Sequence, residues 1–128
     1  MSVEQLQGVR DRLMPMLRLA TEQYRHRVPP GYPTVIDAVE RGIVGLELDP
    51  GFALYVVSDG EQLFADFSYR AHRYDVCSSA SREKFAGLPV DDRRPLAAAV
   101  SDQALRNLVA ELMSRWNSQP GILYVSDS

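Results

Sequence analysis

Polar residues at every second position of one predicted strand are the first candidates for chemistry in this sequence. They are Asp66, Ser68, Arg70 and His72, and Tyr74 continues the series. Because strand side chains alternate between the two faces of a sheet, these residues would share one face. A carboxylate near an imidazole raises the imidazole pKa and suits acid–base catalysis, so Asp66, Arg70 and His72 are candidate catalytic residues.

Simple strand alternation also explains this pattern. An antiparallel sheet commonly has one face in water, and its strands then show a polar residue at every second position. The sequence favours this structural interpretation over a catalytic one. Ser68 and Tyr74 are nevertheless candidate ligand-binding residues, together with Phe85 in the 77–94 loop that follows the strand.

Cys77 is the single cysteine and lies just beyond this series. A cysteine nucleophile needs a nearby base and an electropositive pocket to form its thiolate. A lone cysteine at a strand end is more often a packing residue, so Cys77 is a minor catalytic candidate. The two histidines, His26 and His72, show no metal-ligand spacing with it, and we expect no metal and no cofactor.

The candidate residues lie on the last of three β-rich runs that are separated by turn signals. The runs cover 43–48, 52–58 and 62–76, and the turns are Asp49-Pro50-Gly51 and Asp59-Gly60. Proline presets φ at the second turn position and glycine accepts a positive φ, so both turns favour hairpins. The sequence therefore predicts a three-stranded antiparallel meander.

The middle run, 52–58, is apolar on both faces, whereas the outer runs have one apolar and one polar face. Its two sets of side chains are Phe52, Leu54 and Val56 on one face and Ala53, Tyr55 and Val57 on the other. A strand that is apolar on both faces is usually packed against other parts of the protein on both faces. One cover would be the chain's own helices, and the other a short local segment or a second copy of the protein. The sequence therefore predicts a homodimer, with another protein partner as an alternative.

Helical periodicity precedes the meander over residues 3–28, where apolar residues recur along one stripe. Pro15 lies inside this stripe and removes a backbone donor, so we expect a kink, or two helices meeting, near residues 11–14. Thr34 is expected to cap a short helix that ends before Gly42, although Thr34, Val35 and Ile36 could instead begin a strand.

The clearest amphipathic pattern follows the meander, at 102–117 behind the capping residue Ser101. Pro95 is expected to begin a shorter helix just before it. The 77–94 segment is interpreted as an irregular crossing connection, with a lid or binding loop as the alternative. Residues 122–125 are expected to add a final edge strand.

Arginine supplies all but one of the 14 basic residues, the exception being Lys84. Arginine forks bind carboxylates and phosphates through two parallel hydrogen bonds, which would be a functional reason for this bias. Coding bias in the source genome is the simpler explanation, and the sequence alone favours it.

Composition is that of an ordinary globular domain, with 45% hydrophobic and 24% charged residues in 128. A net charge of −3 argues against a dedicated nucleic-acid binder. One cysteine excludes an internal disulfide framework and fits a reducing compartment. Neither a secretory signal nor a membrane-spanning apolar run is evident, so we expect a cytoplasmic protein with no membrane partner.

Together these features predict one α+β domain over residues 1–128, built from the helices, meander and edge strand described above. The expected function is that of a small accessory or interaction protein, non-enzymatic and self-associating through the second face of 52–58. The alternative is a small-ligand-binding protein or an enzyme. Its site would lie on the polar face of 62–76 and the 77–94 loop.

Overall fold

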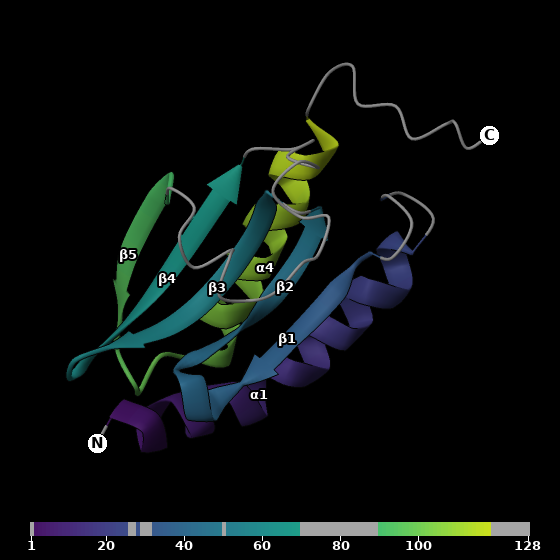
Figure 1. Cartoon of the computed structure of the whole chain (residues 1–128). Helices are drawn as coiled ribbons and strands as arrows, with labels where there is room; N and C mark the ends of the chain where they lie inside the picture. Colours follow the sequence, from purple (N-terminus) through teal and green to yellow (C-terminus); the bar gives the residue numbers. More distant parts are fainter. Residues whose placement is uncertain (1, 26–27, 29–31, 50, 70–89, 119–128) are drawn as a thin grey trace.

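The computed structural model describes residues 2–25, 28, 32–49, 51–69 and 90–118. In chain order its elements are α1 (Ser2–Tyr24), β1 (Thr34–Ala38), the 3₁₀-helix η1 (Val39–Arg41), β2 (Ile43–Asp49), β3 (Phe52–Asp59), β4 (Gln62–Tyr69), β5 (Asp92–Leu96) and α4 (Asp102–Asn117). The strands form one antiparallel sheet in the order β1-β2-β3-β4-β5. Both helices cover the same face of this sheet (Figure 1). The predicted α+β class is confirmed.

The predicted meander is present as β2, β3 and β4, but it is the centre of a larger sheet. β1 pairs with β2 where a short helix was expected, and Thr34 lies opposite Glu47 instead of capping that helix. Thr34, Val35 and Ile36 are all β-branched, which suits a strand that can pair along its whole length. The helix expected to begin at Thr34 is therefore wrong over β1, where the alternative reading as a strand is confirmed. Its expected end is confirmed, because η1 is followed by Gly42, whose φ is positive.

β5 forms where the sequence predicts the end of an irregular connection and the start of a helix. Pro95 lies on this edge strand, where a missing backbone donor does not interrupt the ladder between interior strands. After it the chain turns, and the Val100 N–H donates to the Ala97 carbonyl oxygen over 3.0 Å. The shorter helix expected from Pro95 is wrong.

α1 continues as one helix through Pro15, so the predicted interruption near residues 11–14 is wrong. Pro15 faces solvent, whereas Leu13, Met14 and Leu17 around it are buried. Packing of this stripe against the sheet outweighs the one helical hydrogen bond that proline removes. No helix among the described residues is long and apolar enough to span a membrane. The expected strand at 122–125 lies outside the described residues.

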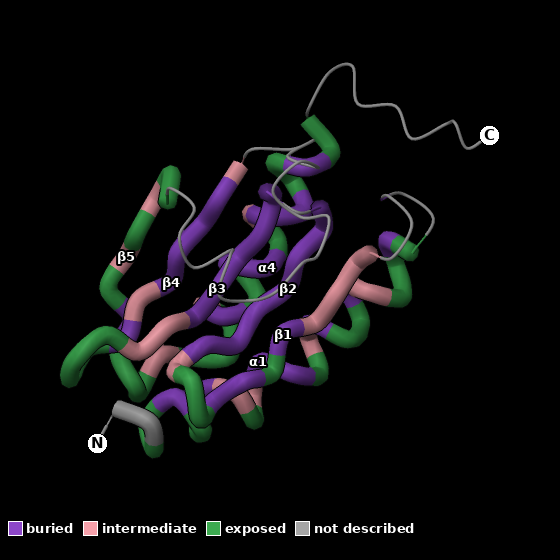
Figure 2. Tube along the Cα trace, in the orientation of Figure 1, coloured by how far each residue is buried: buried purple, intermediate pink, exposed green. Residues whose placement is uncertain are grey.

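The main core lies between the sheet and the two helices. Figure 2 shows the buried positions running along β2, β3 and β4. The largest fully buried side chains are Phe52, Phe67, Leu6, Leu13, Leu17, Leu46, Leu48, Leu54, Leu63, Leu105 and Leu112. They come from both helices and from one face of the central strands, so the helix layer is the first of the two covers that β3 requires.

β3 is buried on its other face as well, as its sequence predicts. Ala53 is 1% and Tyr55 7% exposed in a single chain, whereas Val57 is half-buried. The second cover at Ala53 and Tyr55 therefore does not require another copy of the protein. β2 is buried along its whole length, so the prediction of a one-sided outer strand is wrong there. The physical reason is that β1 makes β2 an interior strand.

Candidate functional site

The sheet face turned away from the helices, here called the far face, carries buried polar side chains. Asp66 and Ser68 of β4 are 4% and 6% exposed, and Glu47 of β2 is 3% exposed. Asp66 lies opposite Tyr55, and Ser68 lies opposite Ala53. The prediction that water covers this face of the strand is wrong for Asp66 and Ser68. At Asp66 the physical reason is β5, which extends the sheet beyond β4 and places Arg93 opposite Asp66.

Asp66 is paired with an arginine of the charged run Asp91-Asp92-Arg93-Arg94, which was not among the predicted site residues. Arg93 lies opposite it on β5, and its Nε and Nη2 each donate to one carboxylate oxygen over 2.8 Å. Its Nη1 reaches Asp59 at 3.3 Å, and its guanidinium lies 4.3 Å from the centre of the Phe64 ring. Hydrogen bonds to Asp66, and after it to Asp59, raise the pKa of Arg93, so its guanidinium stays charged. Both oxygens of Asp66 are thus engaged in joining β5 to β4.

A second buried pair joins β3 to β2. The Tyr55 hydroxyl donates to Glu47 Oε2 over 2.5 Å. Gly45 lies directly opposite Tyr55, and a Cβ at that position would be 2.2 Å from the Leu54 carbonyl oxygen and 3.0 Å from Tyr55 Cδ1. Only glycine gives the tyrosine ring room to reach Glu47. The sequence contains Gly45 and Glu47 two residues apart in one strand and Tyr55 in the next. This combination predicts the Tyr55–Glu47 contact only when it is known that Gly45 lies opposite Tyr55.

Most of the site residues predicted from the sequence lie outside the described residues, namely Arg70, His72, Tyr74, Cys77 and Phe85. The two that are described, Asp66 and Ser68, share one strand face as expected. The catalytic and ligand-binding roles of all seven stay predictions. Within the described part of the chain, no cluster of three histidine, cysteine or acidic side chains is arranged to hold a metal ion.

An apolar groove between α1 and α4 is the second candidate site. It has a volume of about 590 Å³ and lies on the helix layer, where many of its lining residues are exposed. The lining residues are Met16, Leu19, Ala20, Gln23, Tyr24, Arg106, Val109, Ala110, Met113, Ser114, Asn117 and Ser118. Leu19 is 60% exposed and is one of two large apolar side chains so exposed in the described ranges, the other being Val90. A leucine in water beside an apolar groove is typical of a binding surface.

Leu19 also borders a smaller hollow on the β1 side of α1. This hollow has a volume of about 460 Å³ and is lined by Arg18, Leu19, Thr21, Glu22 and Val35. Leu19 therefore stands between two depressions of the surface. Leu19 was not among the predicted site residues. The sequence feature that could have identified it is that this leucine lies outside the apolar stripe of α1.

Polar contacts at both ends fix the two walls of the groove. Arg12 of α1 donates to Asp102 over 2.8 Å and to the Val100 carbonyl oxygen, just before α4 begins. At the other end the Asn117 side chain donates to the Tyr24 hydroxyl over 2.8 Å. The two helices therefore run in parallel, joined at one end by Arg12 outside the groove and at the other by two residues that line it, Tyr24 and Asn117.

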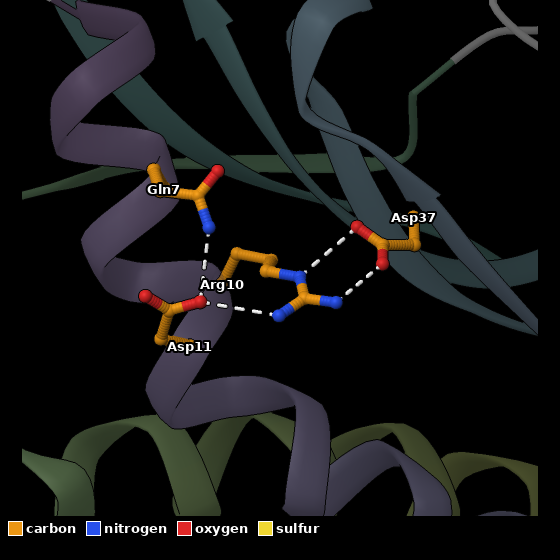
Figure 3. Close-up of polar contacts among 4 residues, drawn as sticks. All are labelled: Gln7, Arg10, Asp11 and Asp37. Carbon is orange, nitrogen blue, oxygen red and sulfur yellow. Dashed lines mark hydrogen bonds and ion pairs between the residues drawn. The ribbon is translucent and has the colours of Figure 1, made fainter.

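α1 is also joined to the edge of the sheet, as Figure 3 shows. Arg10 donates to the two carboxylate oxygens of Asp37 in β1 over 3.1 and 2.6 Å. It also donates to Asp11 over 3.1 Å, and Asp11 accepts a further hydrogen bond from Gln7. Arg10 holds the pKa of Asp37 below its usual range. This network sets the position of the outer groove wall relative to the sheet.

Comparison with known proteins finds no matching family model, curated protein or solved structure. The geometry on its own therefore carries the functional assignment. It defines an α+β domain in which two parallel helices cover one face of a five-stranded antiparallel sheet. The surface that stands out on this domain is the groove between α1 and α4 with Leu19 at its rim.

Proposed function

We propose that the chain is a small, non-enzymatic interaction module that binds the apolar side of a protein helix in the groove between α1 and α4. The exposure of Leu19 beside this groove is the observation that carries the proposal. Helix-in-groove recognition uses apolar side chains at successive helical turns, which fill a groove of this shape. Met16 and Met113 line it, and methionine side chains adapt to the shape of a partner.

The ends of the groove favour one direction for the bound helix. Arg106 lines the groove near the start of α4, and Asn117 and Ser118 line it at the end. A helix C-terminus carries partial negative charge and is stabilised by a nearby cation. A bound helix with its C-terminus at Arg106 would run antiparallel to α1 and α4.

The test is titration of the protein into a trace of fluorescent amphipathic peptide with leucine at the first, fourth and eighth positions, followed by anisotropy. We expect saturable binding that Ala110→Glu weakens by at least about tenfold. Ala110 is exposed and lines the groove, so this change places a charge in the groove without disturbing the core. Ala98→Glu makes the same change at an exposed alanine outside the groove and should bind normally. No saturable binding, or equal binding by both variants, would contradict the proposal.

A small-ligand site on the far face is the second candidate function. The burial of Glu47, Tyr55 and Ser68 on that face favours it, because groups that recognise a ligand are held in place in this way. A ligand that binds the folded chain raises its unfolding temperature. We expect a metabolite screen by thermal shift to find a stabilising compound whose effect is lost in Ser68→Ala. A screen without any stabilising compound would remove this candidate.

A further inference from the structure

We infer that the helix bound in the groove is α1 of a second copy, so that two chains form a symmetric dimer through their helix layers. This inference rests on the proposed function, because it names the partner of the same groove. A two-fold interface uses one surface patch on both subunits, which must therefore be complementary to itself. The helix layer meets this requirement because it carries an exposed leucine beside an apolar groove and a smaller hollow that has charged residues in its lining.

Leu19 is the exposed leucine, and the two hollows lie on either side of it. The larger hollow, about 590 Å³, lies towards α4, and the smaller, about 460 Å³, lies towards β1. When two copies face each other, each Leu19 can enter a hollow of the other copy. Val90, the other exposed large apolar side chain in the described ranges, lines neither hollow.

Two charged residues of α1 are also placed so that they could form ion pairs between the two copies. Arg18 and Glu22 are exposed and lie at equal distances along the helix on either side of Ala20. In an antiparallel pair of α1 helices whose two-fold axis crosses α1 at the level of Ala20, on the solvent side of the helix, Arg18 of each copy opposes Glu22 of the other. Two ion pairs would then flank the leucines. The present contact of Glu22 with Arg25 is an exposed pair of the kind that contributes little and can be exchanged.

The size of the surface indicates a weak dimer. α1 has 23 residues and α4 has 16, so their shared length is about 24 Å at 1.5 Å per residue. Two packed helices are roughly 20 Å wide, which gives roughly 500 Å² on each copy. The two copies together would bury about 1,000 Å², at the lower end of specific interfaces. We therefore expect a dimer that dissociates on dilution.

The helix layer is a better candidate for this contact than the far face of the sheet. Ala53 and Tyr55, whose apolar character motivated a dimer through that face, are already buried in the single chain. Leu19 is 60% exposed in the same chain. A second copy has more apolar surface to cover at α1 than at β3.

The test is sedimentation equilibrium from about 1 to 500 μM, the range in which a weak dimer dissociates. Wild-type protein should approach twice the 14.3 kDa mass of one chain. Leu19→Glu should raise the dissociation constant at least about thirtyfold. Arg18→Glu and Glu22→Arg should each raise it about tenfold, and the double variant should return it to near the wild-type value. Val90→Glu, at an exposed residue outside the groove, should leave it unchanged.

An equimolar mixture of Arg18→Glu chains and Glu22→Arg chains is the decisive sample, because a mixed dimer restores both ion pairs between copies while each chain keeps like charges within its own helix. We expect this mixture to dimerise with nearly the wild-type dissociation constant. Circular dichroism should show the same fold for all variants, since Arg18, Leu19 and Glu22 are exposed. A monomeric mass for the wild type at every concentration would overturn the inference, as would a dimer that Leu19→Glu leaves intact. If the labelled helical peptide still binds a monomeric wild type, the proposed function stands and a different protein supplies the helix.

Discussion

At the scale of single residues, arginine forks join the elements of this fold. Arg94 of β5 donates to both oxygens of Glu111 in α4, over 2.8 and 2.5 Å, and to Asp92. Arg10 and Arg93 make the same two-pronged contact with Asp37 and Asp66. A lysine has one ammonium group and cannot reproduce this geometry. At these three positions arginine therefore has a structural role that lysine would not fill, whatever the origin of the arginine bias.

Replacement of Arg93 by methionine should expose the consequence of a buried, unpaired carboxylate. Asp66 has a side chain that is 6% exposed, so we expect the free energy of unfolding to fall by about 2 kcal/mol or more. Arg25→Met breaks an exposed pair with Glu22 and should cost less than about 1 kcal/mol. Urea denaturation measures both. Equal losses would show that the Asp66 pair is no more important than a surface contact.

Two tyrosines offer a matched comparison of a satisfied and an unsatisfied hydroxyl. Tyr69 Oη is buried and lacks a hydrogen-bond partner in the described structure, and burial raises the pKa of Tyr69. Tyr69→Phe should therefore be neutral or stabilise the protein by up to about 1 kcal/mol. Tyr55→Phe leaves Glu47 without its hydroxyl donor and should destabilise by about 1–3 kcal/mol. The opposite order in thermal unfolding would contradict the assigned contacts.

At the scale of elements, the close approach of β2 and β3 depends on glycine. A Cβ at residue 45 would meet backbone atoms of Leu54 and Tyr55, whereas one at Gly8 of α1 would meet nothing within 4 Å. Gly45→Ala should destabilise by roughly 2–4 kcal/mol, because backbone cannot move aside as a flexible side chain can. Gly8→Ala should stabilise by about 0.5–1 kcal/mol through helix propensity. Chemical denaturation that ranks the two variants alike would contradict this packing.

Two ion pairs between elements make stability depend on acidity. Arg10 lowers the pKa of Asp37, and Arg94 lowers the pKa of Glu111. The unfolded chain therefore takes up protons at a higher pH than the folded chain does. This contribution to stability is complete above the ordinary carboxyl pKa near 4 and is lost as the pH falls further. Urea midpoints from pH 7 to 3 should show a decline that the variant carrying Asp37→Asn and Glu111→Gln reduces. If the urea midpoint of this variant falls between pH 7 and 3 as much as that of the wild type, the two ion pairs are not the source of the pH dependence.

The elements that the sequence predicted well are those with a local signal. The apolar stripe of 102–117 and the alternation around the turn at Gly60 identify α4 and the β3–β4 hairpin. β1 and β5 lack such a signal. Thr34 resembles a helix cap, and Asp92–Leu96 reads as a charged segment with a proline. Both segments become strands because their backbones pair with β2 and β4, which no short stretch of sequence reveals.

The candidate site was missed for a related reason. Asp66 and Ser68 were placed correctly on one strand face, but their burial depends on a neighbouring strand that was not predicted. The groove requires the relative position of α1 and α4, which the contacts of Arg12 and Tyr24 set across about ninety residues of chain. A periodic pattern identifies the buried side of a helix, but it does not show what lies beside it.

At the scale of the whole molecule, the helix layer differs from the rest of the surface. One sheet face is covered by the helices, and β3 is buried at Ala53 and Tyr55 on the other. The outer side of the helix layer instead leaves Leu19 in water between the apolar groove and a smaller hollow lined in part by charged residues. The proposed contact with a second copy lies on this side.

Isotope-filtered NMR of a sample mixed from labelled and unlabelled chains tests this placement most directly. Nuclear Overhauser contacts recorded only between different copies should connect the Leu19 methyl groups of one chain with the Met16 or Met113 methyl groups of the other. Contacts between copies that involve Val57 and the far face, without any from Leu19, would contradict the account.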